Sequence, residues 1–261
     1  MTRILAFLIL FLFNVLIYAQ NTSASPYSAS GLGERSFSGT QASRHMGGLD
    51  VFTDSIHANL NNPAGYGFLK ATTYSIGINY TNTNLASLSE SRNSDIASID
   101  YIAVSIPAGK FSFGFGLLPF TSVGFRVEGN DDTSELQIFN RYEGNGGVNT
   151  AFLTFGFKAF KKIRLGISAN YEFGTLEHSN SRILEGIELY TKVESNSSLS
   201  GVNFVYSTLF REKISNDLTL HASYIFKPHS KLSSKNSQIL YTIPGDGSFG
   251  GDSQEIDLTA L

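Results

Sequence analysis

The sequence predicts an all-β protein of the transmembrane antiparallel β-barrel type, and three observations predict it. Apolar and polar residues alternate with a period of two along most of the chain after Lys70. The chain holds 21 Phe and 12 Tyr, and aromatic residues favour strands, whereas only 16% of its residues are charged. The alternating stretches run for about 11 to 14 residues, which suits a tilted membrane-spanning strand better than a soluble one.

The composition also excludes several kinds of function. The formal net charge of −3 argues against nucleic acid as a partner, because phosphate binding needs a basic surface. A chain without Cys has no disulfide, thiolate metal site or Cys nucleophile. The five His residues lack metal-ligand spacing, and no GxSxG motif occurs. We therefore expect no enzyme activity, no cofactor and no metal.

The N-terminus has the pattern of a signal peptide over residues 1–19. Arg3 gives the positive charge, an apolar run broken only by Asn14 follows, and Ala19 is a small residue at the cleavage position. The rival reading is a transmembrane anchor, but the run of about 15 residues falls short of the roughly 20 needed to span a bilayer. The pattern predicts export of a chain beginning at Gln20 and, with the β pattern, a place in the outer membrane of a Gram-negative bacterium.

The strands are expected in an order that alternates short and long connections. In the first strand, Tyr74, Ile76, Ile78 and Tyr80 share one face. Strands one and two are expected at 70–82 and 96–106. Strand three begins at 110, strand four ends at about 160, strand five begins at 163 and strand six ends at about 211. Strand seven begins at 217 and strand eight at about 254. Long connections are expected at 84–95, 129–135, 176–198 and 229–253. Bacterial barrels have short periplasmic turns and long outer loops, so this spacing favours a barrel over a secreted sandwich.

The residue ranges divide into a signal peptide at 1–19, an N-terminal hatch or plug at 20–69 and barrel strands at 70–261. Eight strands could form a complete small barrel or the front part of a larger one. An eight-stranded barrel is barely wide enough for its own side chains, so a fifty-residue plug would not fit inside it. The segment at 20–69 thus favours an incomplete barrel, a fragment of a larger one.

Several short motifs resemble those of a known family. Ser30-Gly31-Leu32-Gly33-Glu34, Arg44-His45-Met46-Gly47-Gly48 and Asn62-Pro63-Ala64 look like the hatch of FadL/TodX-type outer-membrane transport proteins, in their Bacteroidetes branch. The stretch 114–125, with Tyr142-Glu143-Gly144-Asn145-Gly146-Gly147 after it, is similar to that branch's third strand and its sequel. The family's barrel has fourteen strands, and this chain holds about eight.

The resemblance implies passive uptake of hydrophobic compounds, such as long-chain fatty acids or aromatic hydrocarbons. A ligand would bind an apolar lumen pocket, the hatch would move, and the ligand would leave sideways through the wall. The implied hatch residues are Asn62, Pro63, Ala64, Gly47 and Gly48. The partners expected of such a channel are outer-membrane lipid, a hydrophobic small molecule and the barrel assembly machinery.

Strand three carries a group of residues that would weaken strand pairing. They are Gly114, Gly116, Pro119, Phe120 and Gly124. Proline cannot donate a ladder hydrogen bond, and glycine removes the side chain. The resemblance implies a kink with a lateral gap here, whereas the residues alone fit an ordinary bulge.

Three apolar residues lie at alternate strand positions that are otherwise polar and are expected to face the barrel lumen: Phe152, Val205 and Leu209. They could line a ligand pocket, since such pockets are mostly apolar, or they could contact the plug. Two other functions stay open beside transport. One is a structural barrel, or one associated with type IX secretion, that transports no small molecule. The other is an outer-membrane enzyme that modifies lipid, although the sequence shows no nucleophile–base pair.

Overall fold

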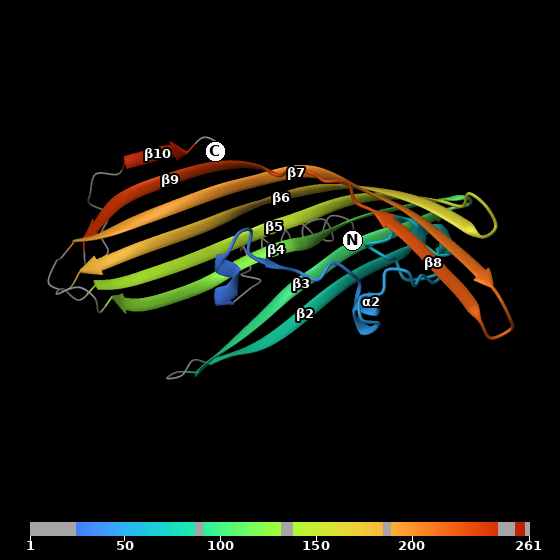
Figure 1. Ribbon diagram of the computed structural model, residues 1–261, viewed down its shortest axis with the longest axis horizontal. Helices are drawn as coiled ribbons and strands as arrows, with labels where there is room; N and C mark the ends of the chain where they lie inside the picture. Colours follow the sequence, from blue (N-terminus) through green and yellow to red (C-terminus); the bar gives the residue numbers. More distant parts are fainter. Residues whose placement is uncertain (1–24, 87–90, 132–137, 185–188, 245–253, 259–261) are drawn as a thin grey trace, which may run out of the picture.

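The computed structural model describes residues 25–86, 91–131, 138–184, 189–244 and 254–258, and within them the chain forms one curled antiparallel sheet with the shape of half a barrel (Figure 1). Its strands are β1 (Glu34–Arg35), β2 (Thr73–Ala86), β3 (Ser91–Ala108), β4 (Phe111–Asp131), β5 (Ile138–Phe157), β6 (Ile163–Leu184), β7 (Leu189–Lys213), β8 (Thr219–Phe226), β9 (Ser233–Pro244) and β10 (Gln254–Leu258). The prediction of an all-β antiparallel fold is confirmed.

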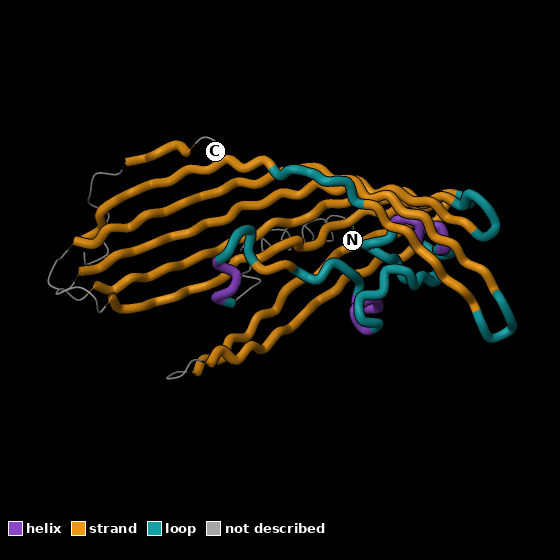
Figure 2. Tube along the Cα trace, in the orientation of Figure 1, coloured by secondary structure: helices purple, strands orange, loops and turns teal. Residues whose placement is uncertain are grey.

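Strands that follow one another in the chain also lie side by side from β2 to β7. Two later strands share the far edge of β7 (Figure 2). β8 pairs with β7 over Tyr206–Lys213, and β9 pairs with it over Leu189–Ser200. β10 lies outside β9. This meander needs only local connections, which is why short turns suffice at one end of the sheet.

Several strands are longer than the sequence analysis predicts. β6 has 22 residues and β7 has 25, so most of the long loop expected at 176–198 is paired strand. The register between β6 and β7 continues unbroken through Thr175↔Ser198 and His178↔Ser195. The Ser, Thr and Asn residues of this stretch form strand hydrogen bonds through their backbones as apolar residues do. Because they are polar on both faces, the sequence shows no alternation of apolar and polar residues that would predict a strand.

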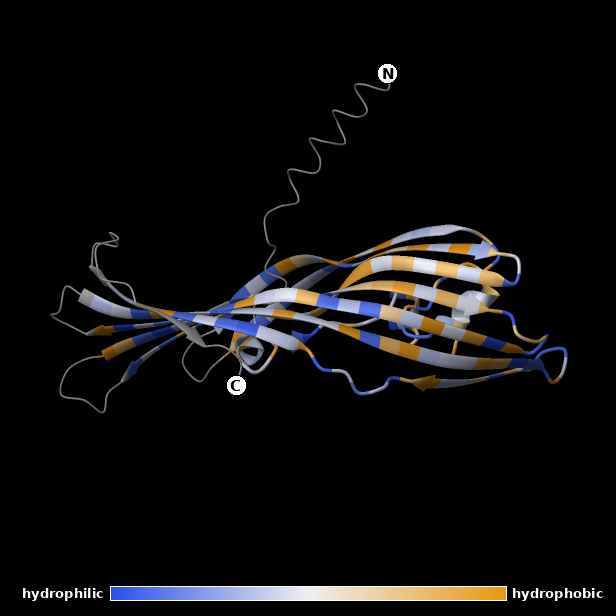
Figure 3. Cartoon of the chain, turned by 90° about the horizontal axis from the view of Figure 1, so that it is seen from above, coloured by the Kyte–Doolittle hydropathy of each residue, from blue (hydrophilic) through white to orange (hydrophobic). Residues whose placement is uncertain are grey.

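The two faces of the sheet differ in character. Large apolar side chains point outward and stay exposed, as Tyr74 at 80%, Ile78 at 67% and Leu153 at 60% show. These residues occupy the part of the sheet nearest the short turns, while the other end is more hydrophilic (Figure 3). The exposed apolar surface is therefore concentrated at one end of the sheet.

Residues 25–72, which we call the N-terminal segment, lie against the concave face. They contain the 3₁₀ turn η1 (Pro26–Ala29), the short helix α2 (Gln41–His45) and a second 3₁₀ turn, η2 (Pro63–Phe68). Most of η2 is buried, and it packs on β5, β6 and β7. The hydrophobic core of the described chain is therefore the interface between this segment and the sheet.

No helix among the described residues is long and apolar enough to cross a membrane. The predicted signal peptide at 1–19 lies outside the described residues.

Candidate functional site

The turn η2 is anchored to the concave face by hydrogen bonds from both ends of the Asn62-Pro63-Ala64 motif. The backbone N–H of Ala64 donates to Ser207 Oγ at 2.7 Å, and Asn62 Nδ2 donates to Ser223 Oγ at 2.8 Å. Pro63 occupies the first position of the turn, where its missing N–H removes no bond. The motif therefore fixes where the N-terminal segment meets β7 and β8.

Glycines on the sheet make room for this turn. A Cβ on Gly166 would lie 2.2 Å from the backbone of Pro63 and Ala64, and one on Gly114 would lie 2.0 Å from the ring of Tyr66. Tyr66 is completely buried with its hydroxyl facing Ser105 and Thr154, and this burial raises its pKa. The segment thus fits the sheet through close backbone approach, which only glycine permits.

A set of Asn side chains holds the loop that precedes η2. Asn59 Oδ1 accepts from the backbone N–H of both Asn61 and Asn62, while Asn62 Nδ2 also donates to the Asp50 carbonyl at 2.8 Å. Asn61 Nδ2 donates to Asp50 Oδ1 at 3.0 Å. These side chains satisfy backbone groups that a loop buried under the sheet would otherwise leave without partners.

Next to this set, Asp54 and His57 close a tight turn. The Asp54 carboxylate accepts from the backbone N–H of Ile56 and of His57, and it contacts His57 Nδ1 at 2.5 Å. Partial burial alone would raise the pKa of Asp54, but the bonds from His57 and Ile56 outweigh it and lower that pKa below its ordinary value.

The concave face beside η2 is polar. Thr154 Oγ1 donates to Ser168 Oγ at 3.0 Å, and Ser168 Oγ donates to Asn170 Oδ1 at 2.9 Å. Asn203 joins this chain, accepting from Asn170 Nδ2 and donating to Glu172 Oε1 at 2.6 Å. Such a hydrogen-bonded polar face gives an acyl chain no apolar surface to contact.

The sheet divides where the β3–β4 ladder ends, at Ile102↔Leu117. Beyond that pair β3 stays with β2, β4 stays with β5, and the two arms separate (Figure 1). We call this opening the fork. A register shift between Pro119 and Thr121 lies just past its base on β4.

The N-terminal segment contacts both arms of the fork. On the β4 arm, β1 pairs with Thr121 and Ser122, and Ser28 Oγ accepts from Gly124 N–H at 3.1 Å. On the β3 arm, α2 is held at Asp100, whose carboxylate accepts from Arg44 at 2.8 Å and from Gln41 at 3.1 Å. The spacing of the two arms is therefore tied to the position of this segment.

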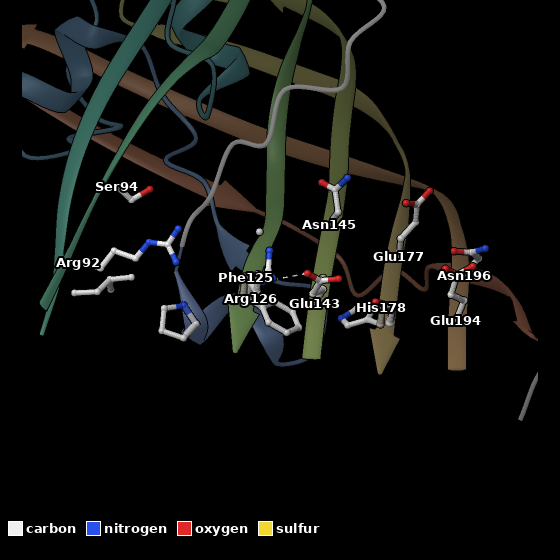
Figure 4. A pocket seen from close by; sticks show the side chains of 15 residues that line it. Arg92, Ser94, Phe125, Arg126, Glu143, Asn145, Glu177, His178, Glu194 and Asn196 are labelled. Atoms are coloured by element: carbon white, nitrogen blue, oxygen red, sulfur yellow. Dashed lines mark ion pairs between the residues drawn. The ribbon is translucent and has the colours of Figure 1, made fainter. Parts of the chain in front are cut away.

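A cavity of about 700 Å³ lies in the fork (Figure 4). Its lining comes from both arms and from the neighbouring strands, and it is mostly polar or charged. Arg126 and Glu143, which both line it, form an ion pair of 3.3 Å. The other charged or polar residues that line it are Arg92, Ser94, Asn145, Glu177, His178, Ser179, Glu194 and Asn196.

The structure brings some of the predicted residues together and separates others. Asn62, Pro63 and Ala64 lie in the anchored turn, whereas Gly47 and Gly48 follow α2 with positive φ angles of 72° and 79°. The strand-three residues fall in two groups on β4: Gly114 and Gly116 lie below the fork, and Pro119, Phe120 and Gly124 lie along its edge.

The three predicted pocket residues are all buried. Phe152 packs with Tyr101, Ala103 and Leu118, and Leu60 of the N-terminal segment lies against that cluster. Val205 and Leu209 are also buried, at 5% and 0% exposure. Phe152 thus belongs to a buried apolar cluster on the sheet that Leu60 of the N-terminal segment contacts.

Sequence reasoning missed the residues that define the fork. Arg44, Gln41 and Asp100 are separated by almost 60 positions and carry no motif, and β1 is only two residues long. A weak signal existed at Asp100, a carboxylate inside a stretch whose apolar residues fall on both phases. Among the described residues, no group of three or more His, Asp or Glu could hold a metal ion.

The fold and site define the class: a curled barrel-type sheet whose concave face holds its own N-terminal segment. A family model for BamG matches residues 1–259, so the chain belongs to the BamG family, which is related to the barrel assembly machinery. Comparisons with curated proteins and with solved structures gave no match.

The family corrects two expectations from the sequence. The resemblance to FadL/TodX-type transport proteins was wrong as an assignment, and with it the predicted uptake of fatty acids or aromatic hydrocarbons. The motifs that suggested it are short and rich in Gly, Asn and Pro, residue types that also occur wherever a chain turns or packs closely. The alternative of a structural barrel without small-molecule transport agrees better with this family.

Proposed function

We propose that this chain is an outer-membrane component with a role in barrel assembly, acting by binding other proteins and without catalysis. The observation that carries the proposal is the BamG family match over residues 1–259. In this role the signal peptide at 1–19 is removed on export, and the exposed apolar band of the convex face contacts lipid.

The concave side supports a protein-binding role over a small-molecule one. The N-terminal segment fills the face beside η2, the neighbouring side chains form a polar hydrogen-bonded chain, and the fork cavity is lined by charged residues. None of these described features offers the apolar enclosure that a hydrophobic ligand would need.

The test is affinity purification of the tagged chain from outer membranes in mild detergent. We expect the barrel subunit of the assembly machinery to co-purify in stoichiometric amount and to persist through a salt wash. An unrelated outer-membrane barrel with the same tag serves as the control. Recovery of the chain alone, or equal recovery of the machinery with the control, would contradict the proposal.

A further inference from the structure

The edge of β4 inside the fork has backbone groups with no partner among the described residues. Gly124 N–H points away from β5, since it donates to Ser28, and the Phe120 carbonyl points the same way, since it accepts from Ser36 N–H. Backbone groups alternate in direction along a strand. The N–H and C=O of Arg126, Glu128 and Asn130 therefore face the open side.

The same edge already accepts an added strand a few residues earlier. β1 pairs antiparallel with Thr121 and Ser122, although it has only two residues. β1 thus shows that the fork is wide enough for a third strand on the β4 arm. Beyond it lies the cavity of about 700 Å³, whose lining includes Pro26.

From this geometry we propose that the fork is a docking site for an extended segment of another subunit, which adds to the edge of β4 at Arg126–Asn130. This inference rests on the proposed function, because that function supplies a protein partner. Main-chain hydrogen bonds would hold the segment, as they do in other cases of strand addition. Alternate side chains of the segment would enter the cavity.

The chemistry of the site favours a particular kind of segment. Three carboxylates line the cavity, at Glu143, Glu177 and Glu194, against two guanidinium groups, at Arg92 and Arg126. Arg126 is already paired with Glu143 and Glu128. Glu194 is paired with Lys192 at 2.5 Å, so Glu177 is the lining carboxylate that has no ion pair among the described residues, and a basic side chain on the incoming segment would pair with it.

The short length of the edge favours a resident partner over a free peptide. Three residues whose backbone groups face the open side of the fork offer about six hydrogen bonds, and each hydrogen bond contributes little net stability because water competes for the same groups. Such weak pairing needs a high effective concentration, which a subunit held beside this chain supplies. A transient unfolded client would lack that advantage.

The experiment places a photo-crosslinking amino acid at Ser94 on the β3 arm and changes Glu128 on the β4 arm. Glu128→Pro removes an N–H that faces the fork and leaves the β4–β5 bonds intact, because the same alternation directs that group away from β5. Glu128→Ala is the matched control, since it removes the same charge and keeps the N–H. Asn130→Pro serves as a second variant if the first does not accumulate in the outer membrane.

In intact cells we expect the Ser94 position to crosslink to one segment of a subunit that also co-purifies with the unmodified chain. Glu128→Pro should lower the yield about tenfold, and Glu128→Ala by no more than about twofold, because backbone bonds carry the pairing. A crosslinker at the outward-facing Leu153 should not reach that segment.

Four results would overturn the inference: equal losses in the two Glu128 variants, crosslinks only to β4 of the same chain, crosslinks only to unfolded client barrels, or no crosslink while the subunit still co-purifies. The last leaves the proposed function standing, whereas loss of co-purification contradicts that function instead.

Discussion

Replacing Gly166 with alanine is expected to detach the N-terminal segment from the sheet. The new Cβ would lie 2.2 Å from the backbone of Pro63 and Ala64, which cannot rotate aside as a flexible side chain could. The turn would have to move, and the fully buried Tyr66 and Leu69 would move with it. Gly129 is the matched control, because a Cβ there meets nothing within 4 Å.

The size of the effect follows from the side chains that lose contact. Burial of a large apolar side chain contributes about 1.5–3 kcal/mol, so Tyr66 and Leu69 together contribute about 3–6 kcal/mol, an upper range. Loss of about 3 kcal/mol would raise the population of the detached state about a hundredfold. The sheet itself should persist, because its strands pair through their own backbones.

Limited trypsin digestion of the protein in detergent measures this change as the rate of cleavage after Arg44. We expect that rate to rise about a hundredfold in Gly166→Ala, in proportion to the detached population, and to stay unchanged in Gly129→Ala. If the two glycine variants are cleaved at the same rate as the unmodified chain, the close packing of η2 on β6 does not hold the segment and the reasoning fails.

Three further predictions concern the same segment. Ser207→Ala should cost about 1–3 kcal/mol of local stability, because it leaves the buried Ala64 N–H without its acceptor; amide exchange at Ala64 measures this, with the exposed Ser200→Ala as the control, and equal exchange in both would contradict it. Arg44→Met should loosen α2 by about 1–2 kcal/mol, since it removes an ion pair to the largely buried Asp100 from a partly exposed Arg; unchanged exchange over residues 41–48 would argue against the tie. The lowered pKa of Asp54 means that its carboxylate stabilises the turn above the unfolded pKa of about 3.9, and that this stabilisation is lost as the pH falls through the lower folded pKa. The NMR signal of the Ile56 amide should therefore shift over that acidic pH range in the unmodified chain and not in Asp54→Asn.

The sequence was informative wherever a strand has one apolar and one polar face. Ile76 and Phe113 reveal their strands because they alternate with small or polar neighbours, and the structure exposes both on the outer face. The same rule failed for β7 from Leu189 to Leu199, where polar residues occupy both faces although the backbone pairs throughout. Strand pairing depends on backbone groups, which leave no trace in the sequence.

The candidate site was predictable only in part for a related reason. The Asn62-Pro63-Ala64 motif was noticed only through its resemblance to a hatch, although Asn-Pro is a common start of a turn, and its partner Ser207 lies 143 positions away. The fork depends on where the pairing of β3 and β4 stops, and no single residue there determines it. The alternating pattern predicted the antiparallel all-β sheet, whereas the short Gly-rich motifs led to the wrong family.

The measurement that tests the central claim most directly is the amount of folded outer-membrane barrels after depletion of this chain. A role in barrel assembly predicts that many unrelated barrels fall together, while their precursors accumulate in the periplasm and inner-membrane proteins stay constant. Restoring the unmodified chain should reverse the loss. If barrel levels are unchanged when the chain has disappeared from the outer membrane, it has no part in barrel assembly and the account is wrong.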